Sequence, residues 1–222
     1  MEPGAIVPLP MAAEPAAACV PIAGEPPVAR AVRALLDGLV AARVVVVVAE
    51  PFVPQVRDVL AEHTSPEVVV CALPVTGSRA DAIATGLEQL APEALSSTPI
   101  LVHDVRYPLV PGEVAGRVIA GLAAGHGIVV PVVPMTDSVK AVDGRGVVVA
   151  TVDRATLLTV QYPRGFASST LSELVAGGAA DELDGAIAAG LPIATVDGHA
   201  DAVRFSLPDD AALLEAIIAS RR

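Results

Sequence analysis

The stretch VVVVVAEPFVPQVRDVLAEHTSPEVVVC (Val44–Cys71) carries the signals of a strand, a helix and a second strand in turn. The five valines of Val44–Val48 are too few for a helix and rich in β-branching, which favours a strand buried on both faces. Phe52–Glu62 has apolar residues at three- and four-residue spacing, which is typical of a helix packed on a sheet. Glu67–Cys71 is apolar again, so the order β-α-β predicts a parallel sheet.

The same alternation continues on both sides of this stretch. Other short apolar runs predict strands at Ala5–Val7, Ile100–His103 and Gly127–Val133. Segments with helical spacing of apolar residues lie between them, at Val28–Leu39, Arg79–Leu90 and Gly112–Ala124. We therefore expect an α/β fold with a Rossmann-like, doubly wound and mostly parallel sheet, and helices on both faces.

A protruding β-hairpin arm is expected after Pro134. Two strand candidates, Asp137–Val142 and Gly146–Val152, are joined by an Asp-Gly turn, which is a strong hairpin signal. Beyond it we expect strands at Thr156–Gln161, Pro192–Val196 and Ala202–Ser206, and helices at Ser168–Ala176 and Pro208–Ala219. The length fits a single domain over residues 1–222, with the arm at about 137–152.

Composition excludes several classes of partner. The formal net charge of −11, with no basic stripe, argues against a nucleic-acid partner. The sequence contains no apolar run near the roughly 18 residues of a membrane span, and no basic segment precedes an apolar run at the N-terminus. We therefore expect a cytoplasmic protein with no membrane partner. Cys71 ends an apolar run and is expected to be a buried small hydrophobe.

Four loops should meet at the carboxyl edge of the sheet, where open α/β sheets bind ligands. They are Pro8–Ala18, Leu73–Arg79, Asp104–Pro108 and Pro134–Asp137. In LVHDVRYP (Leu101–Pro108) a strand ends on His-Asp, and a carboxylate at such a position can hold Mg²⁺ through oxygen. A lone Asp after a strand is more often a loop or cap residue, and His103 is expected to be a core histidine.

Three further segments follow this motif in order: VPVVPMTDSVKAVD (Val130–Asp143), VDRATLLTVQYPRGF (Val152–Phe166) and VDGHADAVRFSLPDDAALLEAI (Val196–Ile217). Together they resemble the 2-C-methyl-D-erythritol 4-phosphate cytidylyltransferase (IspD) family, from about Ala5 to Ser220. The resemblance implies a nucleotidyltransferase-type domain that joins CTP to a sugar-alcohol phosphate in isoprenoid precursor synthesis, with release of pyrophosphate and use of Mg²⁺. It also implies a homodimer in which the β-arm clasps a second subunit.

The resemblance assigns roles to particular residues. It implies catalytic roles for Arg154, which would act across the dimer, and for Arg204, which stands where the family has a phosphate-binding lysine. It places Gly77 and Arg79 in a turn that faces the nucleotide. The substrate-binding set that it implies comprises Asp104, which is also the implied metal ligand, Arg106, Ser138, Arg154 and Arg204.

The phosphate loop departs from the family's pattern. The family has Pro-Ala-Ala-Gly-x-Gly-x-Arg followed by Pro-Lys, whereas Pro8 here is followed by Leu9-Pro10-Met11-Ala12-Ala13-Glu14. Both glycines, the arginine and the lysine are absent, and Ala17 falls nearest the lysine's place. Prolines offer no N–H to a phosphate, and loss of one preorganised charge contact costs about 10²–10³ in rate.

Other family residues that face the substrates are also replaced. Tyr107 stands in place of an arginine, Tyr162 in place of a threonine and Arg164 in place of a glutamine. Ala82 and Ala180 replace a serine and a threonine. If the two tyrosines meet, we expect a smaller and less polar site. Asp181 and Glu182 survive, and an acidic pair at a helix start is also explained by capping.

Three interpretations remain open from the sequence. In one, the chain is a non-catalytic or strongly impaired relative, a pseudoenzyme that keeps the fold and the dimer. In another, it is an active cytidylyltransferase with an atypical phosphate loop. In a third, it is a nucleotidyltransferase that acts on another sugar phosphate.

Overall fold

A computed structural model describes residues 2–11, 15–39, 42–64, 68–90 and 98–221. Its main sheet has the strand order β10-β5-β9-β4-β1-β2-β3, and β8 pairs with β5 beyond this path. The strands are β1 (Gly4–Leu9), β2 (Arg43–Ala49), β3 (Val68–Leu73), β4 (Pro99–Val102), β5 (Ile128–Pro134), β8 (Leu158–Val160), β9 (Arg164–Ala167) and β10 (Ala194–Asp197). The expected mostly parallel α/β sheet is confirmed, with β8 and β9 antiparallel.

The valine run explains why the sheet is buried on both faces. In β2, alternate side chains point to opposite faces, so Val44, Val46 and Val48 enter one core cluster. Val45 and Val47 enter a second cluster on the other face. All five valines are fully buried. A polar side chain at any of these positions would be buried without a hydrogen-bond partner, which would destabilise the protein.

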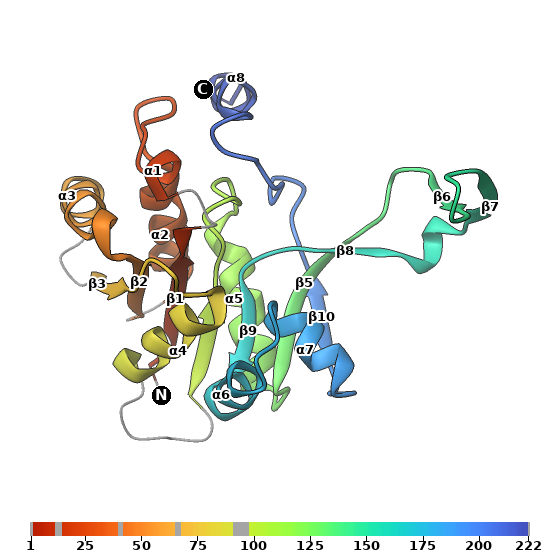
Figure 1. The fold of residues 1–222 in the computed structure, drawn as a ribbon, viewed down its shortest axis with the longest axis horizontal. Helices are drawn as coiled ribbons and strands as arrows, with labels where there is room; N and C mark the ends of the chain where they lie inside the picture. The colour runs from red at the N-terminus through yellow and green to blue at the C-terminus, as the bar shows by residue number, and fades with distance from the viewer. Residues whose placement is uncertain (1, 12–14, 40–41, 65–67, 91–97, 222) are drawn as a thin grey trace.

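Helices cover both faces of the sheet (Figure 1). The first core cluster is covered by α2 (Pro27–Gly38), α3 (Val53–His63) and α5 (Gly112–Ala123). The second is covered by α4 (Arg79–Leu90), α6 (Ser168–Ala176) and α7 (Glu182–Ala188). The two clusters lie on the two faces of one doubly wound sheet, as the sequence predicted.

Strand β9 was not expected. It lies antiparallel between β4 and β5, with Val102 opposite Arg164 and Val129 opposite Gly165. A side chain at Gly165 would come within 2.3 Å of Val118 on α5, so the glycine lets this helix lie against the strand. The segment Arg-Gly-Phe-Ala has no alternation of apolar and polar residues that would predict a strand. It forms a strand because it pairs with β4 and β5, which are distant in the sequence.

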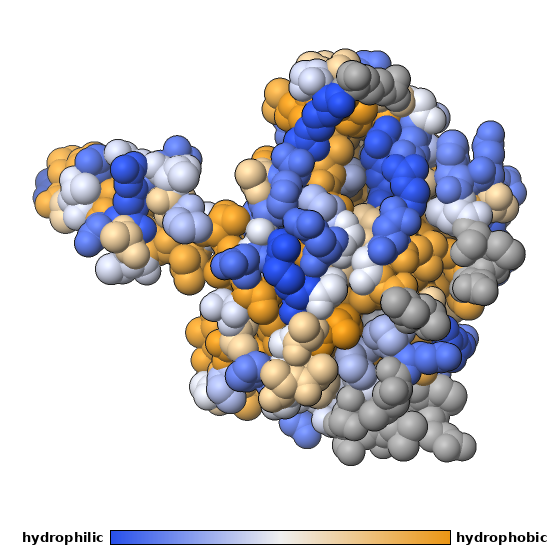
Figure 2. Space-filling model, turned by 180° about the vertical axis from the view of Figure 1, so that it is seen from behind, coloured by the Kyte–Doolittle hydropathy of each residue, from blue (hydrophilic) through white to orange (hydrophobic). Residues whose placement is uncertain are grey.

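The hairpin arm is confirmed. It is formed by β6 (Val139–Val142) and β7 (Val148–Val152), a separate antiparallel pair that leaves the body after β5 and returns before β8. Figure 2 shows it from behind, set apart from the body and with apolar side chains at its surface. Val147, Val148 and Val149 are each more than half exposed.

The C-terminal segment differs from expectation in one element. Residues 202–206 form no strand, although Phe205 N donates to Arg106 O at 2.8 Å. Helix α8 (Ala211–Ala219) follows and packs, through Leu214 and Ile218, on Ile22 and on the short helix α1 (Pro15–Ala18). The expected strand is wrong because the backbone bonds of this segment are turn contacts, such as Ala202 N to His199 O, and the bond from Phe205 N to Arg106 O, which do not form a ladder.

Two smaller findings complete the fold. Cys71 is only partly buried, because β3 is the edge strand of the sheet, so the expectation of a buried cysteine is wrong. Within the described ranges, no helix combines the length and apolar character needed to cross a membrane.

Candidate active site

The carboxyl edge of the sheet brings together side chains from four parts of the chain. β4 ends at Val102, so His103 and Asp104 follow at this edge. Because β9 runs antiparallel, its first residue, Arg164, lies opposite Val102 and carries Tyr162 to the same edge. Arg79, the first residue of α4, and Glu182, the first of α7, complete the cluster.

Tyr162 is the centre of this cluster. It is only 5% exposed, and the guanidinium carbon of Arg164 lies 4.4 Å from its ring centroid. Tyr107 approaches from another side, with the two ring centroids 5.0 Å apart. Nη2 of Arg79 donates to the Tyr162 hydroxyl at 3.3 Å. The two tyrosines therefore meet, which was the condition stated for a smaller and less polar site, and together with the arginines they fill this part of the site.

Two arginines that could meet a phosphate are already paired. Arg79 donates to both oxygens of Glu182, at 3.1 and 3.0 Å. Arg164 donates to both oxygens of Asp181, at 2.7 and 2.8 Å, and to Glu182 at 3.3 Å. The carboxylate of Glu182 is 2% exposed. These ion pairs neutralise the cations in place.

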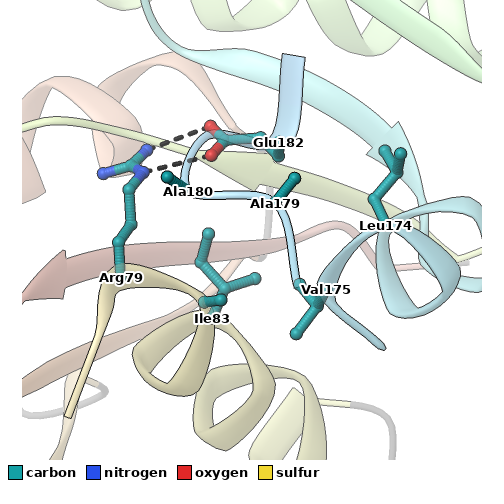
Figure 3. A pocket seen from close by; sticks show the side chains of 8 residues that line it. Arg79, Ile83, Leu174, Val175, Ala179, Ala180 and Glu182 are labelled. Atoms are coloured by element: carbon teal, nitrogen blue, oxygen red, sulfur yellow. Dashed lines mark hydrogen bonds and ion pairs between the residues drawn. The ribbon is translucent and has the colours of Figure 1, made fainter. Parts of the chain in front are cut away.

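Figure 3 shows the Arg79–Glu182 pair above a small apolar hollow lined by Ile83, Leu174, Val175 and Ala179. Its empty volume of about 200 Å³ includes space that is open to solvent. The capping role expected for the acidic pair is confirmed in part, because Asp181 accepts from Leu183 N and Asp184 N at the start of α7. The sequence did not predict the ion pairs that the same carboxylates make.

Asp104 is bound by its own neighbour. Arg106 Nε donates to both carboxylate oxygens, at 2.9 and 3.1 Å, and Nη2 adds a further bond. Burial alone would raise the pKa of Asp104, but the hydrogen bonds and charge of Arg106 hold that pKa below its usual range. The Arg106 side chain, which the resemblance assigned to substrate binding, turns back onto Asp104 and is paired with it.

His103 is a core histidine, as expected. It is 1% exposed and its ring stands edge-on to Tyr162, with centroids 6.3 Å apart. Burial lowers the pKa of His103 to about 4, although Asp104 and the main chain of Tyr107 act in the opposite direction. The imidazole is therefore neutral at pH 7.

The other expected site residues are spread over the chain. Gly77 lies in the turn before Arg79, where a side chain would come within 2.6 Å of Leu73. Ser138 and Arg154 are exposed on the arm, and Arg154 donates to Thr136 O. Arg204 is exposed and lies close enough to Tyr107 for its charge to act on that phenol, whose pKa is raised by burial and by Asp104, while Arg204 acts in the opposite direction. Within one protomer, the arm residues do not join the cluster around Tyr162.

Gln161 was expected only as part of a motif, and the structure gives it a positioning role. Its Nε2 donates to His199 O and Ala202 O, and its Oε1 accepts from His199 N. These three bonds hold the segment before Arg204 against the end of β8. The sequence placed Gln161 at the end of an expected strand but gave no signal of these partners, which lie about forty residues further along the chain.

The N-terminal loop is used for packing. Pro8, Leu9 and Pro10 are buried, and Ala17 packs against the apolar cluster beneath α8. Ala12, Ala13 and Glu14 lie outside the described residues. Where the family's pattern has a lysine, this chain therefore has an alanine in contact with its C-terminal helix.

Comparison with known proteins gives a consistent result. The sequence model described as "IspD: 2-C-methyl-D-erythritol 4-phosphate cytidylyltransferase" matches residues 9–220. Proteins of that name from Saccharopolyspora erythraea and Nocardia farcinica are 35% and 36% identical to the chain over 205 and 206 residues. The matches cover 91% and 92% of this chain, and 90% and 86% of those proteins.

Solved structures agree with this result. The crystal structure of the enzyme of the same name from Thermus thermophilus aligns with a TM-score of 0.73 at 28% identity, covering 99% of this chain and all of that one. A crystal structure of 4-diphosphocytidyl-2C-methyl-D-erythritol synthase aligns with a TM-score of 0.80 at 24% identity, over 98% of both chains, and supports the fold alone.

Proposed function

The chain belongs to the 2-C-methyl-D-erythritol 4-phosphate cytidylyltransferase (IspD) family. From this membership we propose that it catalyses the family's reaction, the transfer of a cytidylyl group, at a strongly reduced rate. In that reaction a phosphate oxygen of the sugar-alcohol phosphate attacks the α-phosphorus of CTP. The bond from that phosphorus to the leaving pyrophosphate breaks. Because both substrates are anions, the rate depends on positively charged side chains that are already positioned at the edge of the sheet to stabilise the negative charge of the transition state.

The observation that carries the proposal is the closed cluster around Tyr162. Arg79 and Arg164 lie on either side of this tyrosine, and both are neutralised by Glu182 and Asp181. A triphosphate could bind these arginines only if their ion pairs with Glu182 and Asp181 were broken. Breaking a buried ion pair costs about 3–5 kcal/mol when one of its two charges is left without a partner. The N-terminal loop supplies no arginine or lysine in compensation.

The sugar-phosphate side of the site is better preserved. Arg204 is an exposed cation beside Tyr107, and we propose that it binds the phosphate of the second substrate. Arg154 and Ser138 lie on the arm, and we propose that they reach the site of a second protomer in a homodimer. The exposed valines of the arm support this assembly, since more than half of each of these apolar side chains is left uncovered by its own chain. We also propose a cytoplasmic location, because the family's substrate CTP is a cytoplasmic metabolite.

The test is a pyrophosphate-release assay with CTP, Mg²⁺ and 2-C-methyl-D-erythritol 4-phosphate. The Saccharopolyspora erythraea protein, assayed in parallel, supplies the reference rate. We expect this chain to be slower by at least about 10²-fold, the effect of losing one preorganised charge contact. A rate within tenfold of the reference would overturn the proposal and favour a fully active enzyme with an atypical loop.

Calorimetry with CTP shows whether a slow reaction is caused by weak CTP binding or by a slow chemical step. We expect no heat of CTP binding at concentrations that saturate the reference protein, because the nucleotide side is closed. Tight CTP binding without turnover would show that the closed cluster opens readily, and would place the defect in the chemical step.

A further inference from the structure

Arg117 on α5 binds the turn that follows β10. Its Nε donates to Asp197 O at 2.7 Å, and its Nη2 donates to Gly198 O at 3.1 Å. Glu113, one turn earlier on the same helix, accepts from Nη1 at 3.3 Å. The planar fork of a guanidinium suits two neighbouring acceptors. One side chain therefore satisfies two consecutive main-chain carbonyls at the carboxyl end of β10.

The same turn is also held by a second side chain and by the main chain of β5. Gly198 N donates to a carbonyl of β5 at 2.8 Å. Gln161, the residue after β8, donates to His199 O at 2.8 Å and accepts from His199 N at 2.9 Å. A Cβ on Gly198 would come within 2.1 Å of Gln161 Oε1, so a glycine allows this close approach. Elements α5, β5 and β8 thus all hold the main chain of the turn at 197–202.

Arg204 lies two residues beyond this turn and is followed at once by a second fixed point. Phe205 is 1% exposed, and its N–H donates to Arg106 O at 2.8 Å. Ala202 is buried as well, and its carbonyl accepts from Gln161 Nε2 at 3.0 Å. Within the described ranges the Arg204 guanidinium is exposed and makes no side-chain hydrogen bond or ion pair. The place of this charge is therefore set by the backbone on either side of it.

Loss of the Arg117 guanidinium would leave two consecutive carbonyls of the turn without their donors. The turn would then depend on Gln161 and on one bond from Gly198, and the chain up to Phe205 would be held less tightly. Charged hydrogen bonds are short and directional, and a misplacement of about 1 Å caused by a distant residue can cost on the order of 10²-fold in rate. The effect should therefore appear at Arg204, in the binding of an anion.

We propose that Arg117 is a positioning residue for the family's reaction, which fixes the turn at 197–202 and, through it, the place of Arg204. Its own Nε and Nη2 are used by main-chain carbonyls, so its contribution passes through the backbone and not through contact with a substrate. The inference rests on the proposed function, because it takes the sugar-alcohol phosphate as the ligand of Arg204.

The first experiment measures binding of 2-C-methyl-D-erythritol 4-phosphate to the full chain by calorimetry. Arg117→Ala should weaken binding about tenfold, the effect of losing one well-placed charged hydrogen bond. Arg117→Lys keeps a charged donor for the carbonyls and should recover part of the affinity. Arg57→Ala is the matched control, because Arg57 is also a helix arginine that donates to a strand carbonyl, Val70 O. Equal affinities of Arg117→Ala and Arg57→Ala would overturn the inference.

A double substitution shows whether Arg117 acts through Arg204. Side chains that act in one chain of contacts have non-additive effects. Arg117→Ala should therefore weaken binding no further in a chain that already carries Arg204→Ala. In the pyrophosphate-release assay, Arg117→Ala alone should raise KM for the sugar-alcohol phosphate and leave kcat within about twofold. Fully additive effects in the double variant, or a loss confined to kcat, would contradict a positioning role.

Hydrogen exchange tests the structural step without any substrate. Arg117→Ala should speed exchange of the main-chain N–H groups of Gly198, His199 and Phe205 at least about threefold, and leave β1 and β2 unchanged. Unchanged exchange in this segment would overturn the inference. If the unsubstituted chain fails to bind 2-C-methyl-D-erythritol 4-phosphate, the proposed function fails, and this inference fails with it. Binding that Arg117→Ala leaves intact would overturn the inference alone.

Discussion

The guanidinium of Arg164 lies over the ring of Tyr162, 4.4 Å from its centroid, while the same guanidinium is bonded to Asp181 and Glu182. One side chain therefore links β9 to the start of α7 through both a ring contact and ion pairs. Cation–π contacts contribute about 0.5–2 kcal/mol. The stability of the site should therefore depend on its carboxylates as well as on its aromatic packing.

Glu182→Gln should destabilise the protein by about 3 kcal/mol, because it leaves Arg79 and Arg164 with one carboxylate between them in a buried setting. Urea denaturation measures the change. Glu113→Gln is the matched control, since Glu113 is an exposed partner of Arg117 on α5 and its loss should cost less than about 1 kcal/mol. Equal effects of the two substitutions would contradict this prediction.

His103 should make the free energy of unfolding depend on pH between about 6.5 and 4. The unfolded chain takes up a proton near pH 6.5, whereas burial lowers the pKa in the folded chain to about 4. The folded state is thus fully favoured above pH 6.5 and loses stability as the pH falls, by about 3 kcal/mol over this interval. His103→Phe should flatten the pH dependence measured by urea unfolding.

The acidic groups act in a lower pH window than His103. Asp104 and Asp181 have pKa values below their usual range, so their contribution is lost only as the pH falls below about 4. If the free energy of unfolding of His103→Phe still fell by the same amount between pH 6.5 and 4, groups other than His103 would be responsible for this pH dependence.

The arm should control the oligomeric state. Val147 and Val149 are exposed on the hairpin, and burial of a Val side chain is worth about 1.5–3 kcal/mol. Val147→Asp with Val149→Asp should convert a dimer into folded monomers, as seen by sedimentation. Leu213→Asp, which alters an equally exposed residue of α8, is the control. A sedimentation coefficient that the double substitution leaves unchanged would argue against the arm as the dimer contact.

Close packing of α2 on α5 should be sensitive to one methyl group. A Cβ on Gly38 would lie 2.1 Å from Gly112 O, so Gly38→Ala should destabilise the protein by about 1–3 kcal/mol. Gly116→Ala, one turn further along α5, meets its nearest atom at 3.7 Å and should be neutral or stabilising by up to about 1 kcal/mol. Thermal unfolding of the two variants tests the contrast.

Local patterns were sufficient to predict most of the fold. The valine run of β2, the helical spacing of α4 and the Asp-Gly turn of the arm each specify their element without help from distant residues. Strand β9 could not be predicted, because its four residues become a strand only between β4 and β5. Residues 202–206 were misjudged for the opposite reason, because an apolar pattern there serves packing under α8.

The sequence identified residues of the candidate site but not their contacts. Tyr107 and Tyr162 both replace polar residues of the family's pattern, but the substitutions alone did not show that the two rings meet. The return of Arg106 onto Asp104 could not be read from the sequence. It depends on a tight turn whose backbone is held by Phe205, about a hundred residues further along the chain.

The central position of β9 has a consequence for synthesis on the ribosome. β4 and β5 are neighbours in the chain, but β9 separates them in the sheet. A nascent chain that has emerged only as far as the arm therefore holds the β4-β1-β2-β3 part of the sheet, with β4 as an open edge, and the strand β5 without any of its partners β8, β9 and β10. The hydrophobic interior becomes continuous only when Arg164–Ala167 leaves the exit tunnel, so a chain truncated before that point should expose two unpaired strand edges and be prone to aggregation.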